Sequence, residues 1–118
     1  EVLLAMPDGD VYNPENVRNI LLSTYRRKQG VIGFSADMVK VGALATTYSE
    51  IEDINTQVAE IAAAFVVTGN LPPPQFPRYF RTVVNEGVAR SLDVRVTDGA
   101  RRFSNLPARL TARQAAKP

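Results

Sequence analysis

Oxygen-bearing side chains gather in a short turn near the start of the chain. Asp8, Asp10 and Asn13 lie in this turn together with Tyr12, and the apolar run 2–6 leads directly into it. Asn13 followed by Pro14 is typical of an N-cap and first helical position, so a helix begins where the turn ends. In an open α/β sheet, ligands bind at this kind of strand-to-helix edge. The turn is therefore a candidate ligand-binding site.

A second strand-to-helix turn follows the apolar run 31–35, which contains Phe34 and ends at the hydroxyl of Ser35. A short apolar run bounded by turn residues is typical of a buried parallel strand. Because parallel strands end at the same edge of a sheet, we expect Asp8, Tyr12, Asn13 and Ser35 to lie along one edge. This requires parallel pairing of residues 2–6 with residues 31–35.

Helical and strand-like segments alternate along the rest of the chain. The longest predicted helix has the apolar spacing Ile51, Ile54, Val58, Ile61 and Phe65, and it ends at Gly69. Ser49 and Glu52 are spaced as a capping box at its start. This alternation predicts an α/β fold with a parallel sheet and helices on both faces. The expected elements are helix 14–28 closed by Gly30, strand 31–35, helix 36–42, strand 43–48, helix 49–69, extended connector 71–77, strand 79–84 and helix 85–92.

Several chemistries do not fit the residues. The chain has no His and no Cys, so it lacks the commonest general base, the commonest metal ligand and any thiolate. The sequence Gly33-Phe34-Ser35-Ala36-Asp37 lacks the second glycine of a nucleophile elbow. Asp8 and Asp10 could hold a divalent cation, but two carboxylates in a turn more often serve the turn itself. We therefore predict no catalytic residues, no metal and no cofactor.

A receiver domain of two-component signalling is an alternative, because the segment that ends in Pro7 resembles one of its strand ends. However, Leu3 stands where that family carries the phosphorylated aspartate, and Lys40 comes before the third strand instead of at its end. Phosphoryl transfer is therefore not expected, although a signalling or interaction module on the same fold remains an alternative.

The C-terminal stretch 95–118 is basic, and nothing in it keeps a helical or strand period. Its charges suit a solvated, flexible tail better than a nucleic-acid interface, since no aromatic platform accompanies them. No apolar run approaches the roughly 20 residues of a membrane helix. The basic residues are Arg95, Arg101, Arg102, Arg109, Arg113 and Lys117, with Asp98 as the one acidic residue beyond position 94.

Five segments together resemble the substrate-binding proteins of ABC transporters, most closely the tryptophan/tyrosine-type subgroup with the type I periplasmic-binding fold. The resemblance covers residues 2–94 and depends on the order and spacing of the segments. They are Leu-Leu-Ala-Met-Pro-Asp followed by Val-Tyr-Asn, Asn-Ile-Leu-Leu at 19–22, Val-Ile-Gly-Phe-Ser at 31–35, Val-Gly-Ala-Leu-Ala at 41–45, and Val-Asn-Glu-Gly-Val-Ala-Arg-Ser-Leu at 84–92.

The resemblance implies a non-catalytic, two-lobed protein of the periplasm or another extracytoplasmic compartment that binds a small amino-acid-like solute in an interlobe cleft and delivers it to an ABC permease. Residues 1–94 would form part of a flavodoxin-like lobe, with helix 49–69 and strand 79–84 crossing between lobes. The carboxylates, N-cap groups and aromatic rings suit a zwitterion. The implied ligand-binding residues are Asp8, Asp10, Tyr12, Asn13, Phe34, Ser35 and Tyr48.

The chain begins with Glu1 and passes at once into an apolar strand, so we expect it to be the later part of a longer protein. The apolar stripe of helix 49–69 would then lack the surface on which it packs. Exposed apolar side chains and a free sheet edge favour self-association, so we predict that this segment forms a homodimer.

Overall fold

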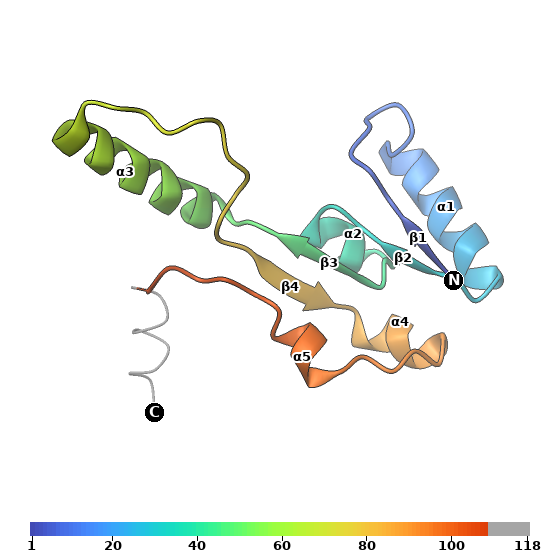
Figure 1. The fold of residues 1–118 in the computed structure, drawn as a ribbon. Helices are drawn as coiled ribbons and strands as arrows, with labels where there is room; N and C mark the ends of the chain where they lie inside the picture. Colours follow the sequence, from blue (N-terminus) through green and yellow to red (C-terminus); the bar gives the residue numbers. More distant parts are fainter. Residues whose placement is uncertain (109–118) are drawn as a thin grey trace. The chain divides into compact units, whose positions relative to one another are not determined.

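The computed structural model describes residues 1–108. Figure 1 shows strands and helices in alternation along most of the chain. The elements are β1 (Val2–Leu4), α1 (Pro14–Arg26), β2 (Gly30–Ile32), α2 (Ala36–Lys40), β3 (Ala45–Tyr48), α3 (Ile51–Thr68), β4 (Arg81–Val84), α4 (Glu86–Ser91) and α5 (Asp98–Arg101).

The chain divides into two compact units. The first holds residues 1–48 and 82–103, and the second holds residues 49–81 together with residues 104–108 of the described chain. The chain therefore passes from one unit to the other three times, after Tyr48, after Arg81 and after Phe103. Each unit is described by itself below.

The sheet has the order β1-β2-β3-β4 and is mostly parallel. Val2 pairs with Gly30 and Leu4 with Ile32, which confirms the predicted parallel pairing of the first two strands. The exception is β4, whose arrow points opposite to that of β3 in Figure 1. The Asn85 N–H just after β4 accordingly donates to the Leu44 carbonyl just before β3, at 2.8 Å. The mixed α/β fold class is confirmed.

The core of the first unit lies where α1 and α2 pack on the sheet. Gly33 directly follows β2 inside this core, and a Cβ atom on it would lie 3.1 Å from Cβ of Met38. The missing side chain thus lets α2 approach the strand end closely. The buried apolar residues of the cluster are Ala5, Leu21, Val31, Met38, Val39 and Ala43.

The first helix begins as predicted but ends differently. Asn13 is the N-cap of α1, and its side-chain oxygen accepts the Asn16 N–H at 2.9 Å. Gly30 does not close the helix. Lys28 takes the left-handed conformation instead, with φ 55°, while Gly30 is buried in β2. The glycine leaves room there for Leu44, because a Cβ atom would lie 2.9 Å from Cδ2 of that side chain.

The predicted capping box of the long helix is shifted by one residue. Glu50 is the N-cap of α3, and the reciprocal bonds join it to Asp53 in place of the predicted Ser49 and Glu52. The Ser49 hydroxyl donates to the Tyr79 carbonyl at 2.6 Å. The other end agrees with the prediction, since Gly69 caps α3 in the left-handed conformation with φ 71°. Asp53 is preferred because it also binds Arg81.

The start of α4 offers a stability test. Asn85 is its N-cap, accepting the Val88 N–H at 3.1 Å, and its amide donates to the Val39 carbonyl at 2.8 Å. Asn85→Ala removes both bonds, so we expect the free energy of unfolding to fall by about 1–2 kcal/mol. Urea unfolding followed by circular dichroism measures this. Asn19→Ala, on the exposed side of α1, is the control and should change little; equal effects of the two would contradict the prediction.

Residues 95–108 of the predicted tail include the short helix α5, capped by Thr97. The remaining tail residues, 109–118, lie outside the described part. Within residues 1–108, none of the helices combines the length and the apolar character that a membrane span requires.

Candidate functional site

The two predicted turns meet at one edge of the sheet. β1 and β2 run parallel side by side, so the loops that follow them leave from the same edge. The rings of Tyr12 and Phe34 contact each other edge to face, with centroids 5.6 Å apart and an angle of 76° between the ring planes. The structure therefore confirms that the first loop and the second loop lie together at the carboxyl ends of the strands.

A cavity of about 700 Å³ opens beside this aromatic pair. Its volume falls in the range of small-molecule sites, and its wall is largely apolar. Ser35 supplies a hydroxyl, while Arg18 and Asp37 supply charges of opposite sign. The wall is completed by Tyr12, Pro14, Val17, Leu21, Leu22, Tyr25, Phe34, Met38, Val41, Gly42 and Val88.

Asp8 and Asp10 shape the first turn. One carboxylate oxygen of Asp8 accepts the Asp10 N–H at 2.9 Å, and the Asp8 carbonyl accepts the Tyr12 N–H at 2.8 Å. The Asp10 carbonyl accepts the side-chain amides of Asn13 and Asn16, both at 3.3 Å. Both aspartates are exposed and neither lines the cavity. Their bonds hold Tyr12 in place, and their contact with a ligand stays a prediction.

Asn13 and Ser35 use their side-chain oxygens as helix caps. Ser35 accepts the Met38 N–H at 3.3 Å and lines the cavity, whereas Asn13 does not line it. Because the Ser35 oxygen accepts this bond, its hydroxyl proton can be donated to a ligand oxygen. Tyr48 lies half-buried at the end of β3, and it does not line the cavity.

The residues that sequence reasoning missed lie on the helices. Val17, Leu21 and Tyr25 follow each other at helical spacing on α1, and Met38 and Val41 come from α2 and its end. That spacing signals an apolar helix face but not whether the face is covered. Here part of the α1 face lines the cavity and stays accessible, with Leu22 and Tyr25 both exposed.

Two features of the described residues around the cavity bear on chemistry: their ability to form a metal site and the pKa values of titratable groups. Among residues 1–108, no three His, Cys, Asp or Glu side chains lie close enough to hold a metal ion. Neither carboxyl of the described chain with a shifted pKa lines the cavity: hydrogen bonds from Arg81 lower the pKa of Asp53, and those from Arg101 lower the pKa of Glu86. What the cavity offers is an apolar wall with a few polar groups, which suits binding.

The chain is similar in fold to known structures. A conserved domain protein from Vibrio cholerae aligns with a TM-score of 0.57 and 22% identity, covering 84% of this chain and 33% of that one. An ABC domain in complex with L-Trp from Streptococcus pneumonia aligns with a TM-score of 0.46 and 19% identity, covering 69% of this chain and 29% of that one. This chain thus spans about a third of the length of these proteins. No protein-family model and no curated protein matches its sequence.

Proposed function

We propose that this chain is part of the solute-binding component of an ABC transporter and binds a small amino-acid-like ligand without chemical turnover. The observation that carries the proposal is the cavity beside Tyr12 and Phe34 at the carboxyl edge of a mostly parallel sheet. Ligands of open α/β sheets bind at this edge. The five sequence segments that resemble ABC substrate-binding proteins include the loops that form it.

The cavity suits the chemistry of an amino acid with an apolar or aromatic side chain. An aromatic ring of the ligand can pack against Tyr12 and Phe34, since aromatic rings favour offset or edge-to-face contacts. Arg18 offers a guanidinium to the ligand carboxylate, and Asp37 offers a carboxylate to the ligand ammonium. Both charged residues line the same cavity as the aromatic pair, and Asp37 also lies 4.0 Å from Lys40.

The same proposal includes a transport role. In this proposal the whole protein would lie in the periplasm or another extracytoplasmic compartment, as the sequence resemblance implies, and would pass its solute to an ABC permease. A protein that only binds and releases needs affinity and a change of state but no catalytic group. The described residues of the cavity, which lack a paired nucleophile and base, are consistent with this role.

Calorimetric titration of the chain tests ligand binding directly. The probes are L-tryptophan, L-tyrosine and L-phenylalanine, with L-glutamate as the comparison. We expect at least one aromatic amino acid to bind and Phe34→Ala to weaken it about tenfold, because the ring contact is worth about 0.5–1.5 kcal/mol beyond the area it buries. Phe76→Ala is the matched control, since Phe76 is exposed in the other unit.

The same titration separates the two roles of Asp8. If its second carboxylate oxygen binds the ligand ammonium, Asp8→Ala weakens binding by about 1.5–3 kcal/mol. An unchanged affinity assigns Asp8 to the turn alone. Absence of binding for all four amino acids would contradict an amino-acid site in this chain.

A further inference from the structure

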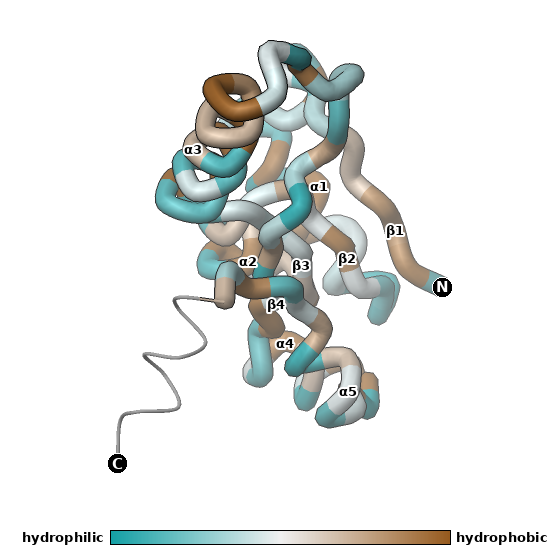
Figure 2. Tube along the Cα trace, turned by 60° about the vertical axis from the view of Figure 1, so that its left-hand side comes forward, coloured by the Kyte–Doolittle hydropathy of each residue, from teal (hydrophilic) through white to brown (hydrophobic). Residues whose placement is uncertain are grey.

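Two apolar surfaces of the described chain differ in the polar groups that accompany them. One is the exposed surface of α3, brown and tan along its later turns in Figure 2. Val58, Val66 and Val67 are all exposed there, on more than one side of the helix, so no single face of α3 defines a partner. The other is the wall of the cavity in the first unit, where hydrogen-bond donors and a cation stand among apolar residues. A wall of this mixed kind defines the chemistry of a small ligand.

Arg18 is the one cationic side chain in the cavity wall. It lies in the second turn of α1, at the spacing from Pro14, Leu21 and Leu22 that puts residues on the same helix face, and all three line the cavity. Glu15 is also spaced to pair with Arg18, but none of the ion pairs among residues 1–108 involves Arg18. The guanidinium is therefore available to an anionic ligand.

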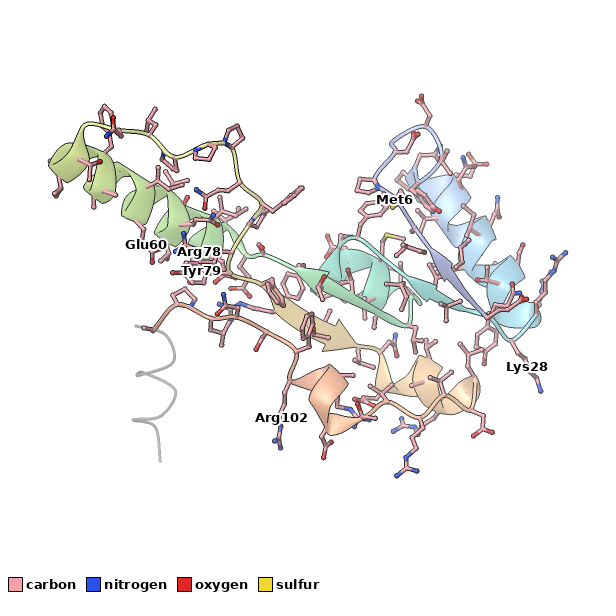
Figure 3. The ribbon with its side chains drawn as sticks, viewed as in Figure 1. Met6, Lys28, Glu60, Arg78, Tyr79 and Arg102 are labelled. Atoms are coloured by element: carbon pink, nitrogen blue, oxygen red, sulfur yellow. The ribbon has the colours of Figure 1, made fainter. Side chains whose placement is uncertain are left out.

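The other cations of α1 and of the turn that follows it lie outside the cavity wall. Arg26, Arg27 and Lys28 come directly after Tyr25, and none of the three lines the cavity. Figure 3 shows Lys28 beyond the last turn of α1. Arg26 is therefore a matched comparison for Arg18, because both are exposed arginines of the same helix and only Arg18 belongs to the wall.

The acidic group of the cavity wall is less suited to hold a ligand. Asp37 is the one carboxylate among the lining residues, and its side chain keeps 93% of its surface exposed. Lys40 lies 4.0 Å from this carboxylate and already supplies a cation. Exposed ion pairs contribute little, so an ammonium bound at Asp37 should raise the affinity of a ligand by at most about fivefold.

The uncharged polar groups of the wall can also donate hydrogen bonds. The Ser35 oxygen accepts the Met38 N–H at 3.3 Å, which leaves its hydroxyl proton for a ligand oxygen. Tyr12 and Tyr25 each bring a phenolic hydroxyl to the wall. A carboxylate accepts bonds from all these hydroxyls and from a guanidinium, whereas an ammonium can only donate. The wall therefore suits the carboxylate end of a ligand better than the ammonium end.

We propose that the cavity selects its ligand by the carboxylate, through Arg18, and that the amino group of an amino acid is not required. The ligand class then extends beyond amino acids to small monocarboxylic acids whose remaining part is aromatic or apolar, such as aryl-substituted propionates. The apolar part packs on the wall beside Tyr12 and Phe34. This inference rests on the proposed ligand site and adds which end of the ligand determines binding.

Calorimetric titration of the wild-type chain tests the selection. Each aromatic amino acid that binds is compared with two analogues, of which one lacks the ammonium and the other lacks the carboxylate. For L-phenylalanine these are 3-phenylpropionate and phenethylamine, and for L-tryptophan they are 3-indolepropionate and tryptamine. We expect the acid to bind within about fivefold of the amino acid. The amine should bind at least about tenfold more weakly, since it loses a charge-assisted hydrogen bond.

Three variants assign the effect to its residue. Arg18→Gln should weaken the amino acid and the acid about tenfold and leave the amine unchanged. Arg26→Gln is the matched control and should leave all three affinities unchanged. Asp37→Asn should weaken the amino acid by less than about fivefold. Circular dichroism verifies that each variant is folded.

The outcomes separate this inference from the ligand site on which it rests. An amine that binds as well as the amino acid, or a larger loss in Asp37→Asn than in Arg18→Gln, would overturn selection by the carboxylate and leave the ligand site in place. Equal effects of Arg18→Gln and Arg26→Gln would overturn the assignment to Arg18. Binding of the acids alone would support the inference and contradict an amino-acid ligand. If neither the amino acids nor their analogues bind, the site itself fails and the inference fails with it.

Discussion

Replacing Asp53 by Asn should lower the free energy of unfolding by about 3 kcal/mol, since it removes the negative charge from a buried, hydrogen-bonded ion pair with Arg81. Asp53 keeps 2% of its surface exposed. Its two carboxylate oxygens accept hydrogen bonds from Nε of Arg81 at 3.0 Å and from Nη2 of Arg81 at 2.9 Å. This is the bidentate geometry of strong ion pairs. One of the oxygens also accepts the Glu50 N–H at 3.0 Å.

The pH dependence of this effect identifies its cause. Hydrogen bonds from Arg81 are the largest influence and lower the pKa of Asp53, against the opposing effect of burial. A carboxyl with a lowered pKa in the folded state contributes stability above its unfolded pKa of about 3.9. That contribution disappears as pH falls through the lower folded-state value. The difference between wild type and Asp53→Asn should therefore be full near pH 7 and shrink below about pH 4.

A second ion pair in the same unit provides the control. Glu60 and Arg78 are 3.1 Å apart, but both side chains keep about half of their surface exposed. Exposed pairs contribute little, so Glu60→Gln should cost less than about 1 kcal/mol. Urea unfolding of both variants at pH 7 and pH 3 separates the cases. A loss in Asp53→Asn that stays the same at both pH values would show that the ion pair is not the cause.

The capping of α3 shows where sequence reasoning reaches its limit. Ser49 and Glu52 have the spacing of a capping box, and so do Glu50 and Asp53, one residue later. Local propensity favours serine as the N-cap. The structure selects the second pair because Arg81, 28 residues further on, reaches Asp53. A partner so distant in sequence leaves no local pattern by which the start of the helix could be placed.

The candidate site was predictable to the extent that strand ends define it. The apolar runs before Asp8 and Phe34 predict parallel strands, and parallel strands bring their following loops together. The cavity wall on α1 and α2 was not predictable, because it depends on how these helices pack and not on the pattern of either one. The contributions of Arg18 and Asp37 likewise follow from packing and have no motif of their own.

The exposed stripe of α3 was predicted from sequence, and the structure confirms that most of it is exposed. Periodicity gives the apolar face directly, whereas its exposure was predicted from the resemblance, which implies that the surface covering this helix belongs to another part of a longer protein. Periodicity could not predict that residues 75–79 cover the other face of α3. That connector has no regular structure, and it binds α3 through Gln57 and Glu60. Self-association through the open face stays a prediction until the mass of the chain in solution is measured.

Alanine variants of Leu21 and Leu22 test whether one face of α1 contributes both to the core and to the cavity wall. Leu21 belongs to the buried cluster and keeps 8% of its surface exposed, while Leu22 keeps 46%. Both line the cavity. Leu21→Ala should lower the free energy of unfolding by about 2–4 kcal/mol, because it removes buried methyl groups and leaves a void beside Val31 and Met38. Leu22→Ala should cost less than about 1 kcal/mol.

The comparison must be made at one protein concentration, because association of copies adds to the apparent stability of the folded state. Chemical unfolding followed by circular dichroism at that concentration gives both values. If the cavity stays open around Leu21 as described, the two losses differ by at least about 1 kcal/mol in the stated order. Equal losses would mean that α1 and α2 close over the cavity in solution, and the ligand site beside Tyr12 and Phe34 would then lose its wall. A larger loss in Leu21→Ala would support the described packing, in which Leu21 belongs to the core and to the wall of the proposed ligand site, while Leu22 lies exposed at the cavity.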